Sequence, residues 1–187
     1  MQTKNCIGFI RCIKADRFMI RMDVYSRQIK RVIGTGVCAV LKNTGGEMTA
    51  EELWRKNGLT GPYEAWAFGG DPDKLAALVK SGVKTATCSA YDLYLAEGEP
   101  IPQEGEYSVI LDSSGEAVCI VKTTKVYVTE FHQVSKEHAY KEGEGDRSLE
   151  YWRKVHIDFL TRQLEGEHMT FTENTKVVCE EFELVYF

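Results

Sequence analysis

The segment from Gly82 to Thr87 reads G-V-K-T-A-T and holds the residue types best suited to chemistry in this chain. An amine and a hydroxyl lie three residues apart, after a glycine that can end a helix with positive φ. A regular strand would send the side chains of Lys84 and Thr87 to opposite faces, whereas a bend or a single helical turn would bring them to one side. There the amine could activate the hydroxyl, provided that burial lowers the pKa of the amine. A Lys and a Thr at this spacing also occur by chance in many proteins.

Regular elements on both sides must position this segment. Asp71 and Pro72 fit the N-cap and first position of a helix that closes at Gly82. The pattern also predicts helices over 49–58, 135–141 and 149–164, and strands over 107–111, 117–128 and 175–187. Strands with hairpin connections and a few helices indicate an α+β fold, a small curled sheet or barrel flanked by helices.

Size and composition describe an ordinary globular protein. The chain has 187 residues with 43% hydrophobic content, enough for one domain with a proper core. No apolar run approaches the roughly 20 residues that span a bilayer, so we expect no membrane partner. The six cysteines form no C-x-x-C pair and no zinc spacing, and no signal peptide is recognisable. We therefore expect a reduced, cytoplasmic protein without a metal or another cofactor.

The net charge of -5 divides the chain at Met48. Residues 1–47 hold nine Lys and Arg against three Asp and Glu, whereas residues 48–187 hold 14 against 25. The first part is a basic N-terminal extension, either a translated leader ahead of a natural start at Met48 or a basic arm that binds a partner. An acidic body does not fit a protein that holds long nucleic acid through its phosphates, which leaves a small ligand or a short RNA in a local pocket.

Several pieces of residues 48–187 together resemble an ASCH domain, a branch of the PUA-like superfamily. They are the segment from Ser81 to Thr87, the E-H-A-Y-K-E run over 137–142, the acidic link up to Asp146 before S-L-E-Y-W, and the aromatic-glycine run from Trp66 to Asp71. The resemblance implies a small β-barrel of a kind associated with RNA.

A small bacterial acetylcytidine amidohydrolase of this superfamily uses a Lys, a Thr and a Glu. By motif, Lys84, Thr87 and Glu142 match these three residues, which implies a base, a nucleophile and a proton carrier for amide hydrolysis. That enzyme's motif continues T-x-R, whereas Thr87 is followed by Cys88 and Ser89, so an arginine is missing. The alternative is a Lys84–Glu142 ion pair that only orders a loop.

Four further residues are candidate substrate contacts: Trp66, Phe68, Gly82 and Glu144. The two aromatic residues fit stacking on a base, although at least one of them is expected in the core. Glu144 either lines the pocket or is solvated. Trp152 and His156 share the apolar face of their helix and are expected to be buried there.

These observations predict a protein that recognises a nucleoside or a short RNA, and that hydrolyses an N-acylated nucleobase if the Lys, Thr and Glu are catalytic. A non-catalytic RNA-binding module is the main alternative, and a ribonuclease is a third reading that the family suggests. The sequence does not predict the oligomeric state.

Overall fold

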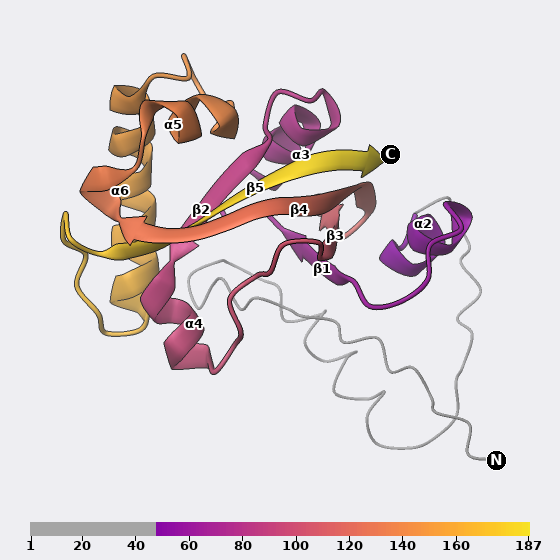
Figure 1. Ribbon diagram of the computed structural model, residues 1–187, viewed down its shortest axis with the longest axis horizontal. Helices are drawn as coiled ribbons and strands as arrows, with labels where there is room; N and C mark the ends of the chain where they lie inside the picture. The colour runs from indigo at the N-terminus through magenta and orange to yellow at the C-terminus, as the bar shows by residue number, and fades with distance from the viewer. Residues whose placement is uncertain (1–47) are drawn as a thin grey trace.

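The computed structural model describes residues 48–187, and the expectations for residues 1–47 lie outside this part. The described chain forms a five-stranded sheet that curls into a half-barrel, with helices around it (Figure 1). The α+β prediction is therefore confirmed. The helices are α2 (Ala50–Lys56), α3 (Pro72–Lys80), α4 (Tyr91–Glu97), the 3-10 turn η1 (Phe131–Gln133), α5 (Lys136–Glu142) and α6 (Leu149–Gly166). The strands are β1 (Glu64–Ala67), β2 (Ala86–Ala90), β3 (Tyr107–Leu111), β4 (Ala117–Glu130) and β5 (Lys176–Tyr186).

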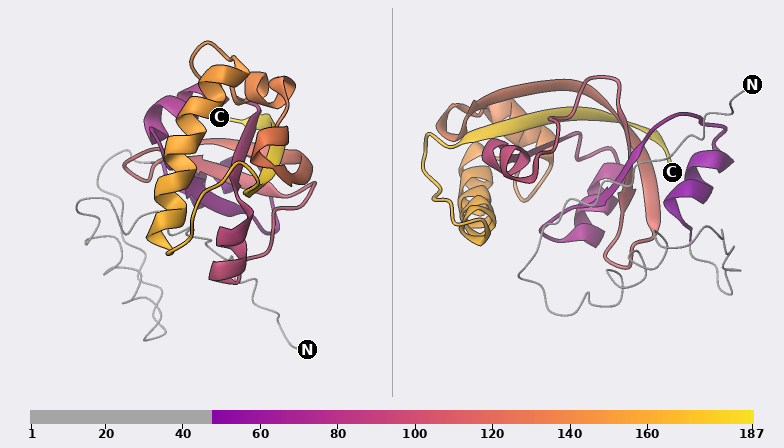
Figure 2. Two further views of the ribbon diagram at one scale, coloured as in Figure 1. Left: turned by 90° about the vertical axis from the view of Figure 1, so that its left-hand side faces the viewer. Right: turned by 90° about the horizontal axis from the view of Figure 1, so that it is seen from below.

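The strand order is β1-β3-β4-β5-β2, with β1 parallel to β3 and the other neighbours antiparallel. The two long strands β4 and β5 run side by side and arch across the molecule (Figure 2). Their register shifts between Thr123 and Lys125, which is the kind of bulge that bends a strand and helps a sheet to curl. The edge strands β1 and β2 come from segments only about twenty residues apart in sequence, on the two sides of α3.

Three groups of buried apolar side chains hold the helices on the sheet. Helices α5 and α6 pack near β2 and β5 through Trp152, Leu160 and Cys179, at one end of the molecule (Figure 1). Helix α3 covers another part of the sheet, and α2 packs through Trp54 at the opposite end. Each covering layer removes apolar surface from water, and this burial stabilises the fold by roughly 25 cal/mol for each Å² of apolar surface.

The local signals for helix starts are confirmed by the structure. Thr49 and Glu52 form a capping box at the start of α2, and Asp71 accepts a hydrogen bond from the Lys74 amide at the start of α3. Ser135 and Ser148 cap α5 and α6 in the same way. Helix α6 ends at Gly166, close to the end of the predicted helix.

Strands β1 and β2 and helix α4 were not predicted. The chain after Gly82 makes no helical turn at Thr87, because Thr87 lies inside the edge strand β2. Helix α4 follows β2 directly. Its N-cap is Ala90, which offers no side-chain hydrogen bond, so the usual sequence signal for a helix start is missing.

Candidate functional site

A turn after α3 brings Lys84 into the interior. Gly82 has φ of 73°, and the amides of Val83 and Lys84 both donate to the Leu78 carbonyl. The turn lies against the end of α5, where Gly143 has φ of 76°. A Cβ on Gly143 would lie 2.6 Å from the Val83 carbonyl oxygen, so only glycine fits this approach.

Lys84 is 1% exposed and binds two carboxylates. Its Nζ lies 2.9 Å from Glu142 Oε2 and 3.1 Å from Glu144 Oε1, and it also donates to the Glu142 carbonyl at 3.4 Å. Glu142 is the last residue of α5 and is equally buried. The predicted contact between Lys84 and Glu142 therefore exists, across 58 residues of sequence.

The second oxygen of Glu142 faces helix α6. Trp152 Nε1 donates to Glu142 Oε1 at 2.8 Å, and His156 Nε2 lies 3.6 Å from the same oxygen. His138 Nε2 lies 3.3 Å from it, from within α5. The His156 ring stacks on Trp152 at 4.2 Å between centroids. A buried carboxylate thus sits among several N–H groups and cations, as such a group requires.

The buried charges stabilise one another. Burial by itself lowers the pKa of Lys84, but Glu142 and Glu144 outweigh burial, so the pKa lies above its ordinary value. Burial raises the pKa of Glu142, but Lys84 and His156 outweigh it and hold the pKa well below its ordinary value. Burial lowers the pKa of His156, but the charge of Glu142 and its hydrogen bond outweigh burial, so the pKa lies above its ordinary value. Lys84 is therefore a cation and Glu142 an anion near neutral pH, so burial does not produce the neutral lysine that a resting base requires.

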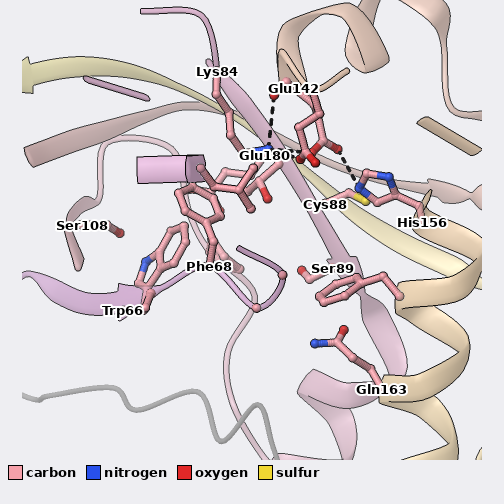
Figure 3. A pocket seen from close by; sticks show the side chains of 18 of the residues that line it. Trp66, Phe68, Lys84, Cys88, Ser89, Ser108, Glu142, His156, Gln163 and Glu180 are labelled. Carbon is pink, nitrogen blue, oxygen red and sulfur yellow. Dashed lines mark hydrogen bonds and ion pairs between the residues drawn. The ribbon is translucent and has the colours of Figure 1, made fainter. Parts of the chain in front are cut away.

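These charges lie at one wall of a cavity of about 270 Å³ (Figure 3). We call Lys84, Glu142, Glu144 and His156 the charged wall. The strands contribute a second group of lining residues, made up of serines and threonines and one glutamate. We call this group the hydroxyl wall: Thr87, Ser89, Ser108, Thr123 and Glu180. Cys88 and the α6 residues Phe159, Arg162 and Gln163 also line the cavity.

The hydroxyl wall comes from four strands. Thr87 and Glu180 are cross-strand partners on β2 and β5, so their side chains share one face of the sheet. Thr123 donates to Glu180 Oε1 at 2.7 Å, and Ser89 Oγ lies 2.8 Å from the Tyr94 hydroxyl. Buried and half-buried polar groups in a cavity are the usual means of orienting a small ligand.

Two aromatic side chains complete the lining. Trp66 and Phe68 meet edge to face, with ring centroids 4.9 Å apart. Phe68 is buried in the core below α3, which confirms the expectation that at least one of the pair is core, and Lys84 Nζ lies 5.2 Å from its ring centroid. Trp66 is only partly buried. It can therefore offer a ring to a ligand.

Six of the seven predicted site residues line this cavity: Trp66, Phe68, Lys84, Thr87, Glu142 and Glu144. Gly82 is exposed, does not line the cavity, and acts through the turn that directs Lys84 inward. Side chains alternate along β2, so Thr87 shares a face with Ser89 and not with Cys88. Within residues 48–187, no hydrogen bond joins Thr87 to Lys84 or Glu142.

Several cavity residues are not predicted from the sequence, among them Cys88, His156 and Glu180. A polar residue at a buried position of the last strand is the one signal that could have identified Glu180. Cys88 and His156 carry no local signal, because they meet Glu142 only when β2, α5 and α6 come together in the fold.

Comparisons with known proteins agree with this architecture. The model of the ASCH domain family matches residues 64–186, so the chain belongs to this family. A crystal structure of an ASCH domain from Lactobacillus crispatus JV V101 is similar, with 34% identity, a TM-score of 0.64, and coverage of 67% of this chain and 80% of that one. A crystal structure of a protein from Enterococcus faecalis V583 is also similar, with 34% identity, a TM-score of 0.65, and coverage of 73% and 85%. No curated protein matches the chain. No helix within residues 48–187 is long and apolar enough to cross a membrane.

Proposed function

We propose that the cavity binds a nucleoside or a free nucleobase. The observation that carries the proposal is the combination, in one cavity of about 270 Å³, of a partly exposed tryptophan, a wall of hydroxyls and a buried lysine held between two carboxylates. Small-molecule sites usually combine an apolar surface with a few well-placed polar groups, in a volume of roughly 300–1,000 Å³. At about 270 Å³ this cavity is slightly smaller than that range, which suits a single base or nucleoside.

The lining supports recognition of a flat heteroaromatic ring. Trp66 is held edge to face by Phe68, and stacking of a base on an aromatic side chain contributes about 1–3 kcal/mol. Glu144 and Glu180 can accept hydrogen bonds from a ring N–H or an exocyclic amine, and the hydroxyls can donate or accept. Nucleobases present these donor and acceptor edges.

The charge of the lining favours an unphosphorylated ligand. Five glutamates line the cavity, against the cations Lys84 and Arg162: Glu64, Glu106, Glu142, Glu144 and Glu180. Since Lys84 is already bound by two of these carboxylates, it has little attraction left for a phosphate. An RNA strand bound through its phosphates is therefore a weaker fit to this cavity than a nucleoside.

Calorimetric titration with uncharged nucleosides, their 5′-monophosphates and a short single-stranded RNA, each at two salt concentrations, tests the proposal. We expect nucleoside affinity to change little with salt and each monophosphate to bind about tenfold more weakly, which corresponds to about 1.4 kcal/mol. Trp66→Leu should weaken nucleoside binding, whereas Phe187→Leu, at an exposed aromatic residue that does not line the cavity, should not. RNA binding that falls steeply with salt and ignores Trp66→Leu would identify the non-catalytic RNA-binding module instead.

A second candidate function is hydrolysis of an N-acylated nucleobase amide. It is favoured by the common location of Lys84, Thr87 and Glu142 on one cavity. In this reaction the Thr87 oxygen attacks the acyl carbon and its proton passes to a neutral Lys84. The C–N bond then breaks, the leaving amine takes that proton, and the acyl group stays on Thr87 as an ester. Water then attacks the ester, gives one proton to the departing Thr87 oxygen and releases the carboxylic acid.

Hydrolysis requires a proton shift that the resting charges oppose. Lys84 must first release a proton, and Glu142 Oε2 is the nearest acceptor at 2.9 Å. A bound ligand that excludes water favours the neutral lysine–carboxylic acid pair over the ion pair, because charged groups are costly in a dry site. Thr87 must also approach Lys84, since the two make no direct hydrogen bond here.

Turnover of acylated nucleosides by substituted proteins tests this candidate. Thr87→Ala should abolish turnover and Thr87→Ser should retain part of it, because the hydroxyl survives. Lys84→Arg should abolish turnover while nucleoside affinity is kept, because arginine remains charged. Turnover retained in Lys84→Arg rules out the lysine as the base, and nucleoside binding without any turnover leaves only the binding function.

A further inference from the structure

Three residues with metal-binding side chains meet at one wall of the cavity. Cys88 lies in β2, Glu142 ends α5 and His156 lies in α6, and a ligand atom from each lies within 4.8 Å of the other two. All three are buried and line the cavity, and Figure 3 shows Cys88 beside the His156 ring, next to the contact that joins His156 to Glu142. None of them is near another in sequence, so the sequence holds no metal-ligand spacing that could reveal the cluster.

From this geometry we propose a site for a thiophilic divalent cation of the zinc type, bound by Cys88, Glu142 and His156. Thiolate and imidazole ligands select zinc and its chemical relatives over magnesium or calcium. Three protein ligands with an open fourth position are typical of zinc sites that also bind water or a ligand. Because all three residues line the cavity, the open position faces the cavity.

The hydrogen bonds of His156 support the proposal independently of the cluster. Its Nδ1 lies 2.9 Å from the Trp152 carbonyl oxygen, and a carbonyl can only accept, so Nδ1 carries a proton. Nε2 is therefore the ring nitrogen that faces Glu142 Oε1, 3.6 Å away. Without a metal, a proton on Nε2 lies between the ring and the carboxylate, and a bound metal ion would take the place of that proton. A backbone carbonyl on the other ring nitrogen is the usual support of a metal-bound histidine.

Trp152 supports two of the three ligands. Its carbonyl fixes the ring of His156, and its Nε1 donates to Glu142 Oε1 at 2.8 Å. Such outer hydrogen bonds orient the ligands of metal sites and commonly change metal affinity by about 10–100-fold. The fully buried Trp152 is therefore a positioning residue as well as a core residue.

The charges and distances suit a bound dication. A metal replaces the proton on the Cys88 thiol, because coordination deprotonates a thiol outright. The positive charges of Lys84 and the dication then balance the negative charges of the Glu142 and Glu144 carboxylates and the Cys88 thiolate. Lys84 keeps Glu142 Oε2, while the metal uses Oε1. The three ligand atoms lie within 4.8 Å of one another, and zinc–ligand bonds of about 2.0–2.3 Å would require them to move closer by roughly 1 Å.

Titration with Co²⁺, an optical substitute for Zn²⁺, tests the site in the full chain with Cys6, Cys12 and Cys38 replaced by serine. We expect saturation at one Co²⁺ per chain, the visible bands of tetrahedral cobalt and a thiolate-to-cobalt charge-transfer band, all removed by Zn²⁺. Cys88→Ser should abolish the charge-transfer band, and His156→Gln should weaken binding by about 100-fold or more, since even outer residues cost 10–100-fold.

Cys119→Ser is the matched control, since Cys119 is a buried strand cysteine that does not line the cavity. It should leave the bands unchanged, and circular dichroism should show that each variant is folded. Absence of saturable binding or of the charge-transfer band before any Cys88 substitution overturns the proposal, as does a band that persists in Cys88→Ser. The spectra do not depend on nucleoside binding, so failure of the proposed function and failure of this site are distinguishable.

Discussion

On one side of the cavity the polar groups are mainly charged and bind one another across three segments of the chain, and on the other side they are mainly hydroxyls carried by strands. The charged wall joins Lys84, Glu142, Glu144 and His156 through ion pairs that connect the turn after α3 with α5 and α6. The hydroxyl wall lies on strands that are already held by main-chain hydrogen bonds. The first wall therefore depends on its own polar contacts for its position, whereas the second is positioned by the sheet.

We therefore expect the charged wall to contribute mainly to the stability of the fold and the hydroxyl wall mainly to ligand binding. Removing one member of the charged wall leaves a buried partner uncompensated, which is among the most destabilising changes that a single substitution makes. Removing a hydroxyl or changing Glu180 leaves the strands paired, so the loss is expected mainly in ligand binding. The predictions that follow test this division, beginning with the largest effect.

Lys84→Met should lower the free energy of unfolding by about 3–5 kcal/mol, because Glu142 stays buried without its cation. Urea unfolding followed by circular dichroism measures the loss. Arg55→Met is the control, because the Arg55–Glu51 pair is exposed and should contribute about 0–1 kcal/mol. Equal losses in the two variants would mean that the charged wall does not hold the fold.

Gly143→Ala should destabilise the protein more than Gly98→Ala does. Both glycines have positive φ, at 76° and 68°, so both variants carry a backbone cost of about 1–2 kcal/mol. A Cβ at Gly143 also meets the Val83 carbonyl at 2.6 Å, whereas a Cβ at Gly98 has nothing within 4 Å. The close approach should add about 1–3 kcal/mol, the usual range for overpacking.

Thermal or urea unfolding of the two glycine variants gives this difference directly. If Gly143→Ala costs no more than Gly98→Ala, the turn before Lys84 can move away from α5 freely. The charged wall would then be less rigid than the contacts indicate.

Glu180→Gln should leave stability within about 1 kcal/mol, because the amide oxygen can still accept the hydrogen bond from Thr123. It should weaken binding of an amine-bearing nucleoside about tenfold, or by about 1.4 kcal/mol, as measured by calorimetry. Glu183→Gln, at an exposed position on the same strand, is the matched control and should change neither quantity. A large loss of stability in Glu180→Gln would mean that this residue, like the charged wall, is needed to hold the fold.

The smallest effect is expected at Glu181, beside the hydroxyl wall on β5. Burial raises the pKa of this carboxyl, but its bonds to Lys141 and Lys125 outweigh burial, so the pKa lies below its ordinary value. A lowered pKa adds stability that is present above the unfolded value of about 4.3 and is lost as pH falls through the folded value. Glu181→Gln should therefore cost up to about 1 kcal/mol at pH 7 and almost nothing near pH 2.

Urea unfolding of the parent protein and Glu181→Gln at several pH values tests this. The two stabilities should converge as the pH falls below about 4. If the free energies of unfolding of the two proteins differ by the same amount at every pH, the Lys141–Glu181 contact between α5 and β5 does not stabilise the protein through its charges.

Much of the fold could be predicted from sequence because its signals are local. The capping residues Thr49, Asp71 and Ser135 act within three residues of themselves, so the starts of α2, α3 and α5 were predicted correctly. Strands β3, β4 and β5 carried a clear strand pattern. Strands β1 and β2 and helix α4 were missed, because the two edge strands take their conformation from pairing with β3 and β5 and α4 begins without a capping side chain.

The sequence by itself determined the residue types of the site, the glycine that turns the chain before Lys84 and the acidic character of residues 48–187. Only the tertiary structure decided that Lys84 meets two carboxylates, that its pKa rises and does not fall, and that Cys88 and His156 join Glu142. The physical reason is that burial and the neighbouring charges fix the state of an ionisable group. Both come from segments that the sheet and α6 bring together, and no local pattern records them.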